Sequence, residues 1–293
     1  MERTVRTPDG RTLAVEDTGD PGGRPVLVHM GTPNSRLLFG PHVTDAIERG
    51  IRLICYDRPG YGGSSPHPGR TVADCAADVR AICATLGIDR LAMWGISGGG
   101  PHVLACAALL PDLVVAAASL ASPAPMEAEG LDWFDGMGEL NVEDVQLTKA
   151  DPEAARAKTE TDRLEILETS AEDLAASLQS VLTPVDAAAL SGEVAEYLTR
   201  ANRAGLAPGI EGWWEDAIAM DTSDWGFDLR SISIPLLLMH GRHDRFVPFA
   251  HGEWLAGQIP GVEARLLDHD GHLTLPKNRI GEVHAWLLAH LER

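Results

Sequence analysis

Residues 90–112 read RLAMWGISGGGPHVLACAALLPD, and this stretch decides the fold. An apolar run at residues 90–96 leads into glycines around Ser97, and an apolar helical pattern follows from residue 102. Two interpretations of the glycines compete. They form either a phosphate-binding loop at a helix N-terminus or a tight strand-to-helix turn that presents Ser97 as a nucleophile.

The spacing of the glycines argues against the phosphate-binding loop. Such loops follow G-x-x-x-x-G-K-[ST] or G-x-G-x-x-G, whereas residues 95–100 match neither pattern and have no lysine nearby. Residues 95–99 instead match G-x-S-x-G, in which small neighbours accommodate a strained backbone at the serine. The sequence therefore predicts that Ser97 is a nucleophile.

Strand and helix patterns alternate on both sides of this stretch. PDGR at residues 8–11 predicts the turn of an N-terminal hairpin. Helical spacing covers residues 71–88, 251–259 and 280–292. Further apolar runs that predict buried strands cover residues 25–30, 52–57, 114–123, 235–241 and 262–268. Buried runs separated by helices predict an α/β fold with a mostly parallel, doubly wound sheet of about eight strands.

The composition changes between Ala124 and Arg230. This segment is alanine-rich and poor in strand patterns, and it holds 24 acidic and 7 basic residues, whereas the rest of the chain holds 19 and 17. Residues 153–168 and 171–182 show amphipathic helical spacing. We predict a core domain formed by residues 1–123 and 231–293, with a helical, acidic lid inserted at residues 124–230.

The net charge of −19 bears on possible partners. It argues against nucleic acid, whose binding depends on basic patches. The acidity of the insertion indicates a solvated helical surface or, alternatively, a field that favours cationic substrates. No apolar run reaches the roughly 20 residues of a membrane span, and the N-terminal stretch is polar, so we expect a cytoplasmic monomer or homodimer without a membrane partner.

The four cysteines lack metal-type spacing, and we expect them to be buried free thiols.

A serine nucleophile requires a base and a carboxylate that orients the base. Asp244 follows the apolar run 235–241, and His272 follows the run 262–268. Loops at the carboxyl ends of parallel strands share one edge of the sheet, so Ser97, Asp244 and His272 are expected to meet there. Weaker alternatives for the carboxylate and the base are Asp268, Asp270 and His269.

Together these motifs resemble the α/β-hydrolase family with a lid. The resemblance covers nearly all of the chain and is carried by GTPNS (31–35), YDRPGYGGS (56–64), GISGGG (95–100), GRHDRFVP (241–248) and DGHLTL (270–275). It implies that Ser97 is the nucleophile, Asp244 the acid and His272 the base. It also implies an oxyanion hole formed by the backbone N–H groups of Gly98 and Thr32.

One position departs from the family pattern. Family members often carry His-Gly where this chain has Met30-Gly31, with His29 one place earlier. The family histidine supports the loop by hydrogen bonds, which the Met30 side chain cannot make. Arg58 and Asp57 are expected to fix their loop, and His102, His240 and His243 are expected to be structural or, for His102, part of the pocket wall. The predicted substrate-binding residues are Met30, His29, Trp213 and Trp214, although core packing is the alternative for the tryptophans.

The resemblance implies a hydrolase that acts through an acyl-enzyme, without a cofactor or a metal. We predict that its small-molecule substrate is a carboxylic ester with a small or medium hydrophobic group. Two alternatives use the same fold: an aminopeptidase resembling proline iminopeptidases, and a hydrolase of carbon–carbon bonds. An alternative from a different class is a catalytically silent protein that binds a small molecule.

Overall fold

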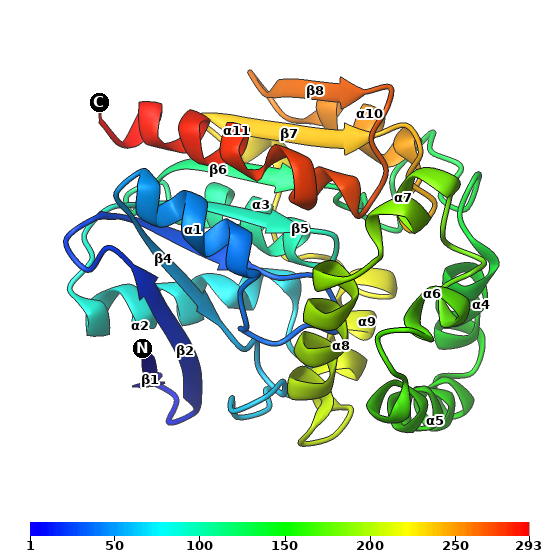
Figure 1. The fold of residues 1–293 in the computed structure, drawn as a ribbon. Helices are drawn as coiled ribbons and strands as arrows, with labels where there is room; N and C mark the ends of the chain where they lie inside the picture. Colours follow the sequence, from blue (N-terminus) through cyan, green and yellow to red (C-terminus); the bar gives the residue numbers. More distant parts are fainter. Residues whose placement is uncertain (293) are drawn as a thin grey trace.

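One eight-stranded sheet forms the centre of the computed structural model, which describes residues 1–292 (Figure 1). Strand β2 pairs antiparallel with β1 and with β4, and all the other pairs are parallel. The predicted fold class and strand number are therefore confirmed. In spatial order the strands are β1 (Glu2–Arg6), β2 (Thr12–Gly19), β4 (Ile51–Tyr56), β3 (Arg24–His29), β5 (Leu91–Ile96), β6 (Val114–Leu120), β7 (Leu236–Gly241) and β8 (Glu263–Leu267).

Helices cover both faces of this sheet (Figure 1). One face carries α1 (Gly40–Glu48) and α11 (Thr274–Leu291), and the other carries α2 (Cys75–Leu86), α3 (Gly99–Leu109) and α10 (Phe249–Gln258). A short 3₁₀ turn, η1 (Val72–Asp74), precedes α2. Every residue of β5 is buried. Burial on both faces explains why this strand reads as an unbroken apolar run rather than an alternating one.

Six helices lie between β6 and β7, beyond the carboxyl ends of the central strands (Figure 1). They are α4 (Glu139–Ala150), α5 (Pro152–Glu168), α6 (Leu174–Ser177), α7 (Pro184–Ala189), α8 (Glu193–Leu206) and α9 (Glu211–Asp221). Residues 121–235, all of them described, contain no strand but include the 3₁₀ turn η2 (Leu229–Ser231). Tyr197 of α8 belongs to one of the two main hydrophobic core clusters, and Met220 of α9 belongs to the other. These two helices therefore pack into the core around the sheet. The predicted domain boundaries stay a prediction.

The segment 171–182 differs from the expected amphipathic helix. Only residues 174–177 are helical, and the Val181 N–H donates to the Leu178 carbonyl in a turn. Val181 is fully buried and packs so closely on Gly138 that a Cβ there would overlap with it. Tertiary packing of this turn therefore overrides the local helical preference.

All four cysteines are buried and free, as expected. The sulfur atoms of Cys75 and Cys106 lie 3.6 Å apart between α2 and α3. Across residues 1–292, no helix combines the length and the hydrophobicity needed to cross a bilayer.

The start of α3 depends on the absence of a side chain at Gly99. A Cβ at this position would overlap with the backbone carbonyl groups of His29 and Met30. We predict that Gly99→Ala lowers the free energy of unfolding by about 2–3 kcal/mol, because backbone atoms cannot move aside as a side chain would. Urea denaturation of the purified variant measures this loss.

Gly257 in α10 is the matched control, because a Cβ there meets nothing within 4 Å. Gly257→Ala is expected to be neutral or to stabilise the protein by up to about 1 kcal/mol through helix propensity. Equal stabilities of the two variants would contradict the proposed close approach.

Candidate active site

Ser97 occupies the turn between β5 and α3. Its φ of +54° lies in the left-handed region, which residues other than glycine rarely adopt. The Ser97 N–H donates to the Leu120 carbonyl of β6 at 2.9 Å, and the Ser97 carbonyl accepts from the Gly100 N–H at 2.8 Å. These bonds hold the strained backbone on both sides, as a strand–turn–helix nucleophile requires.

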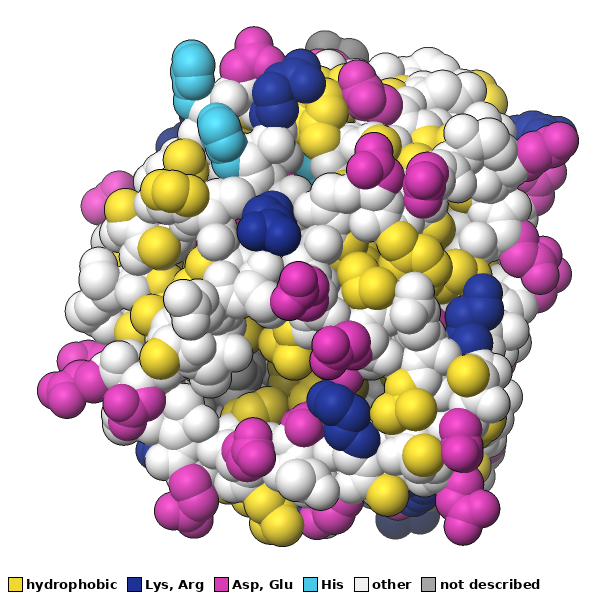
Figure 2. Space-filling model, turned by 90° about the vertical axis from the view of Figure 1, so that its right-hand side faces the viewer, with side chains coloured by type: hydrophobic (Ala, Val, Ile, Leu, Met, Phe, Trp, Pro, Cys, Tyr) yellow, Lys and Arg dark blue, Asp and Glu magenta, His cyan; other side chains and the backbone are white. Residues whose placement is uncertain are grey.

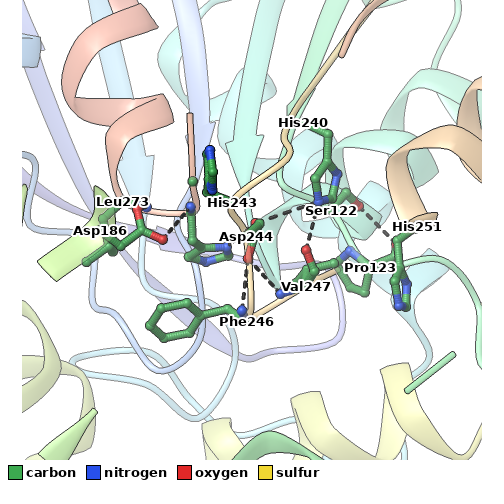
Figure 3. Close-up of polar contacts among 12 residues, drawn as sticks. Ser122, Pro123, Asp186, His240, His243, Asp244, Phe246, Val247, His251 and Leu273 are labelled. Carbon is green, nitrogen blue, oxygen red and sulfur yellow. Dashed lines mark hydrogen bonds and ion pairs between the residues drawn. The ribbon is translucent and has the colours of Figure 1, made fainter. Parts of the chain in front are cut away.

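Asp244 and His272 form a buried pair, and Figure 3 shows Asp244 beside Phe246 and Val247. Asp244 follows β7, and its Oδ1 accepts the backbone N–H groups of Phe246 at 2.9 Å and Val247 at 2.8 Å. Its Oδ2 lies 2.8 Å from Nδ1 of His272 and 3.6 Å from Nε2 of His240. Because the carboxylate can only accept, Nδ1 of His272 carries the proton, and its Nε2 is free to act as a base.

The surroundings of His272 have opposing effects on its pKa. Burial by itself lowers the pKa, but the charge and hydrogen bond of Asp244 and the charge of Asp186 outweigh burial and raise it above the ordinary value. A carboxylate next to an imidazole stabilises the imidazolium form. The His272 ring is therefore better able to accept a proton than an isolated imidazole.

Phe246 connects this pair to Ser97. Its ring stacks on the His272 ring with 4.6 Å between the centroids, and it lines the same cavity as Ser97. The hydrogen bonds among residues 1–292 include none between Ser97 Oγ and His272. Catalytic hydrogen bonds often tighten only when substrate is bound.

The alternative candidates for the acid and the base have other partners or are exposed. Asp268 is exposed and pairs with Arg242 at 2.7 Å, and Asp270 pairs with Arg279 at 2.9 Å. His269 is exposed. Asp244 is therefore the aspartate that the structure joins to the His272 ring.

Thr32 and Gly98, the predicted oxyanion residues, lie against each other. Thr32 belongs to the loop after β3, and a Cβ added to Gly98 would overlap with Thr32 Oγ1. Both residues line the cavity with Ser97. Within residues 1–292, neither backbone N–H donates to another protein group. Two unpaired donors beside a nucleophile are what stabilisation of an oxyanion requires.

Arg58 supports the loop where the Met30 side chain cannot. Its Nη1 donates to the Met30 carbonyl, and its Nη2 donates to Thr32 Oγ1 at 3.1 Å. Asp57 holds the neighbouring chain by accepting the backbone N–H groups of Arg36 and Gly63. Asp57 thus fixes its own loop through Gly63, as expected, whereas the contacts of Arg58 with Met30 and Thr32 fix the loop after β3.

The histidines and the methionine of this region are buried beneath the loop. The His29 and His102 rings stack with 5.8 Å between their centroids. Burial lowers the pKa of both, that of His102 to about 3, so both are neutral at neutral pH. His102 Nδ1 lies 2.8 Å from the Gly98 carbonyl. Among the described residues that line the cavity, neither His29 nor Met30 is present, so their predicted substrate contacts stay a prediction.

A cavity of about 360 Å³ opens above Ser97 between the sheet and the inserted helices. The face formed by these helices is hollowed, with hydrophobic side chains inside the hollow and acidic ones around it (Figure 2). Trp213 contributes to the lining, whereas Trp214 does not. The centre of the Trp214 ring instead lies 5.6 Å from the guanidinium carbon of Arg156. The other aromatic and methionine side chains of the lining are Trp133, Met137, Met220 and Phe246.

The cavity also has an acidic side, whose residues lie outside the sequence motifs. Lys158 pairs with Asp144 and Asp162 at 2.7 Å each. Asp221, in contrast, is not hydrogen-bonded by any described side chain, and burial together with the charges of Asp216 and Asp144 raises its pKa to about 7. The acidic lining residues are Asp144, Asp162, Glu165 and Asp221. Within residues 1–292, no group of His, Cys, Asp and Glu side chains has the arrangement of a metal site.

Asp186 of α7 holds the loop that carries His272 (Figure 3). Its side chain is fully buried, and its two oxygens accept the backbone N–H groups of His272 and Leu273 at 2.8 Å each. Burial raises the pKa of this carboxyl group. No local sequence pattern could reveal this contact, because 86 residues separate Asp186 from His272.

Comparisons with known proteins agree with this fold. Residues 24–278 match the family model described as alpha/beta hydrolase fold. The AB hydrolase superfamily protein YisY of Bacillus subtilis is 28% identical over 93% of this chain and 92% of its own. The pimeloyl-[acyl-carrier protein] methyl ester esterase of Nitrosomonas europaea is 29% identical over 89% and 92%. An esterase from Exiguobacterium antarcticum has the same fold, with a TM-score of 0.71 and 21% identity over 100% of both chains.

The Asp244 carboxylate is expected to control the titration of His272. In Asp244→Asn the burial that lowers the pKa remains but the stabilising charge is lost, so the pKa of His272 falls. A proton NMR titration of the His272 ring, assigned with a His272→Gln variant, measures this shift.

In the native protein the raised pKa of His272 adds to the free energy of unfolding. This contribution is complete below about pH 6.5 and is lost as the pH rises through the folded-state pKa.

Asp268→Asn is the matched control, because it removes an exposed carboxylate that pairs with Arg242. The pKa of His272 should not move in this variant. A similar shift in both variants would show that Asp244 does not act on His272 specifically.

Proposed function

We propose that this chain, which belongs to the α/β hydrolase fold family, is a serine hydrolase that cleaves carboxylic esters. The observation that carries the proposal is the left-handed turn that presents Ser97 to a cavity. The same cavity is lined by Phe246, which stacks on the ring of the buried His272–Asp244 pair. A strained turn at a cavity beside a paired histidine is the arrangement of a nucleophile and its base.

The proposed reaction has two steps. His272 Nε2 accepts the Ser97 hydroxyl proton as Oγ attacks the ester carbonyl carbon, and the oxyanion accepts the N–H groups of Gly98 and Thr32. The carbon–oxygen bond to the alcohol then breaks, and the alcohol takes the proton from His272. In the second step His272 deprotonates a water molecule that attacks the acyl-enzyme, which releases the carboxylic acid and regenerates Ser97. Asp244 orients the imidazole and stabilises its cation throughout.

The cavity supports an ester with a small or medium hydrophobic group. Its volume of about 360 Å³ and its apolar walls fit a small organic acyl chain. The esterase among the relatives supports ester chemistry in the family. Hydrolysis rates on a panel of esters, aminoacyl amides and diketones separate the three activities. Esters test the proposed esterase, aminoacyl amides test the aminopeptidase, and diketones test the hydrolase of carbon–carbon bonds.

Ser97→Ala should abolish hydrolysis of p-nitrophenyl butyrate, with kcat falling by about 10⁴-fold or more because the nucleophile is lost. A fluorophosphonate probe should label native Ser97, as located by peptide mass spectrometry, and should not label the variant. Ser191→Ala, which removes an exposed serine of the insertion, is the control and should retain labelling and turnover. A native protein that neither reacts with the probe nor hydrolyses esters would refute the proposed serine hydrolase and favour the alternative of a silent binder.

The acidic cavity lining predicts a preference for a cationic ester. Acetylcholine and 3,3-dimethylbutyl acetate have the same shape but differ in charge, and the ratio of their kcat/KM values isolates the charge. We expect about a tenfold preference for acetylcholine at low ionic strength, equivalent to about 1.4 kcal/mol, and a decline with added salt. The preference should increase as the pH rises through about 7, because the Asp221 carboxyl group then becomes charged.

Asp221→Asn should remove this dependence on pH and most of the preference. Glu153→Gln is the control, because Glu153 is exposed in the first turn of α5 and lies outside the cavity lining. Loss of the His272 proton affects both substrates equally and cancels in the ratio. Equal kcat/KM values for the two esters at low salt would refute the preference.

A further inference from the structure

We propose that Asp216, on helix α9 of the inserted segment, is a positioning residue that fixes the oxyanion loop through Arg58 and the Thr32 side chain. The inference rests on the proposed function, because it assigns a role to the loop that supplies the Thr32 N–H. The sequence motifs do not include Asp216, and 184 residues separate it from Thr32.

Asp216 is a completely buried carboxylate with four side-chain partners. Its Oδ2 accepts the Thr32 hydroxyl and the Tyr61 hydroxyl, each at 2.9 Å, and the Arg58 guanidinium at 2.5 Å. Its Oδ1 lies 2.7 Å from Nη2 of Arg70. Burial by itself raises the pKa of Asp216, but the two arginines outweigh it and hold the pKa well below its usual range. The group is therefore a permanent charge at neutral pH.

The contacts of Asp216 and Arg58 enclose the peptide that supplies the donor. The proposed oxyanion N–H belongs to the peptide between Gly31 and Thr32. On one side of that peptide Arg58 donates to the Met30 carbonyl. On the other side the Thr32 hydroxyl donates to Asp216 and accepts from Arg58 at 3.1 Å. With both ends held, the N–H has little freedom to turn away from the substrate, and such preorganisation is the source of oxyanion stabilisation.

The two predicted donor residues are supported by groups that face the same carboxylate. His102, whose Nδ1 lies 2.8 Å from the Gly98 carbonyl, directs its Nε2 toward Asp216 Oδ1 at 3.8 Å. Thr32 itself lies directly against Gly98. A shift of Asp216 would thus disturb the spacing between the two donors, and small misplacements of catalytic groups are costly.

Helix α9 also forms part of the substrate cavity, which Trp213, Ala217 and Met220 line. At its N-terminal turn Gly212 packs so closely on Gly60 and Tyr61 that a Cβ would overlap with them. The helix cannot move away from the loop after β4 without breaking this contact and the Arg58–Asp216 ion pair. The inserted segment therefore shapes both the substrate wall and the oxyanion loop.

Four variants test the positioning role. Thr32→Val removes the hydroxyl but keeps the backbone N–H, and Thr32→Ser restores the hydroxyl. Asp216→Asn removes the charge but keeps the shape. Asp78→Asn is the matched control, because Asp78 on α2 is an equally buried carboxylate that pairs with Arg11 at 2.8 Å and lies outside the cavity lining.

We expect Thr32→Val and Asp216→Asn to lower kcat for p-nitrophenyl butyrate by about 10- to 100-fold, with less than about a threefold change in KM. The rate of fluorophosphonate labelling should fall in parallel, because the phosphonyl oxygen occupies the oxyanion position. Thr32→Ser should recover most of the loss. Asp78→Asn should lower the melting temperature but leave kcat and the labelling rate unchanged.

Amide hydrogen exchange of the peptide that contains residues 30–35 provides a readout independent of activity. Exchange there should become faster in Thr32→Val and Asp216→Asn but not in Asp78→Asn. Unchanged exchange, or an equal loss of kcat in Asp78→Asn, would overturn the inference. If native Ser97 is not labelled by the probe, the proposed hydrolase function fails, and the exchange measurement still decides whether Asp216 holds the loop.

Discussion

The close approach of backbone to backbone around Ser97 is the constraint on which the rest of the structure depends. The turn after β5 is wedged between β3 and β6, with the Ser97 N–H bonded to the Leu120 carbonyl and Gly99 resting on the His29 carbonyl. A side chain at Gly99 would force the turn away from the His29 and Met30 backbone, and one at Gly98 would overlap with Thr32 Oγ1. The glycines thus allow the left-handed backbone that directs Ser97 toward the cavity.

Three buried aspartates hold the chain segments that converge on this turn. Asp244 orients the His272 ring, Asp186 accepts the backbone N–H of His272, and Asp216 binds the Thr32 hydroxyl and Arg58. Each carboxylate accepts hydrogen bonds from several donors, which offset part of the cost of burying a charge. Two of the three belong to the inserted helices. The insertion is thus attached to the loops of the candidate site rather than merely covering them.

The acidity of the insertion has more than one physical role. A solvated helical surface accounts for exposed residues such as Glu153 and Glu168. Asp186 and Asp216, in contrast, are completely buried and bind protein groups. Asp221 lines the cavity, is not hydrogen-bonded by any described side chain and has a raised pKa, so it is available to a ligand. A count of charges along the sequence cannot separate these three environments, because burial and partners arise only when distant segments pack together.

The sequence by itself predicted the strands of the sheet, helices α2, α3, α5, α10 and α11, and the turn at Ser97, and it suggested the roles of Asp244 and His272. These features depend on local periodicity, on glycine at positions of close approach and on the rule that parallel strands end at one edge. Only the tertiary structure decided that Arg58 supports the loop beside Met30, that Trp213 rather than Trp214 lines the cavity, and that residues 171–182 form a turn around a short helix. Those outcomes depend on contacts between residues far apart in the chain, such as Thr32 with Asp216, whose distance no local pattern encodes.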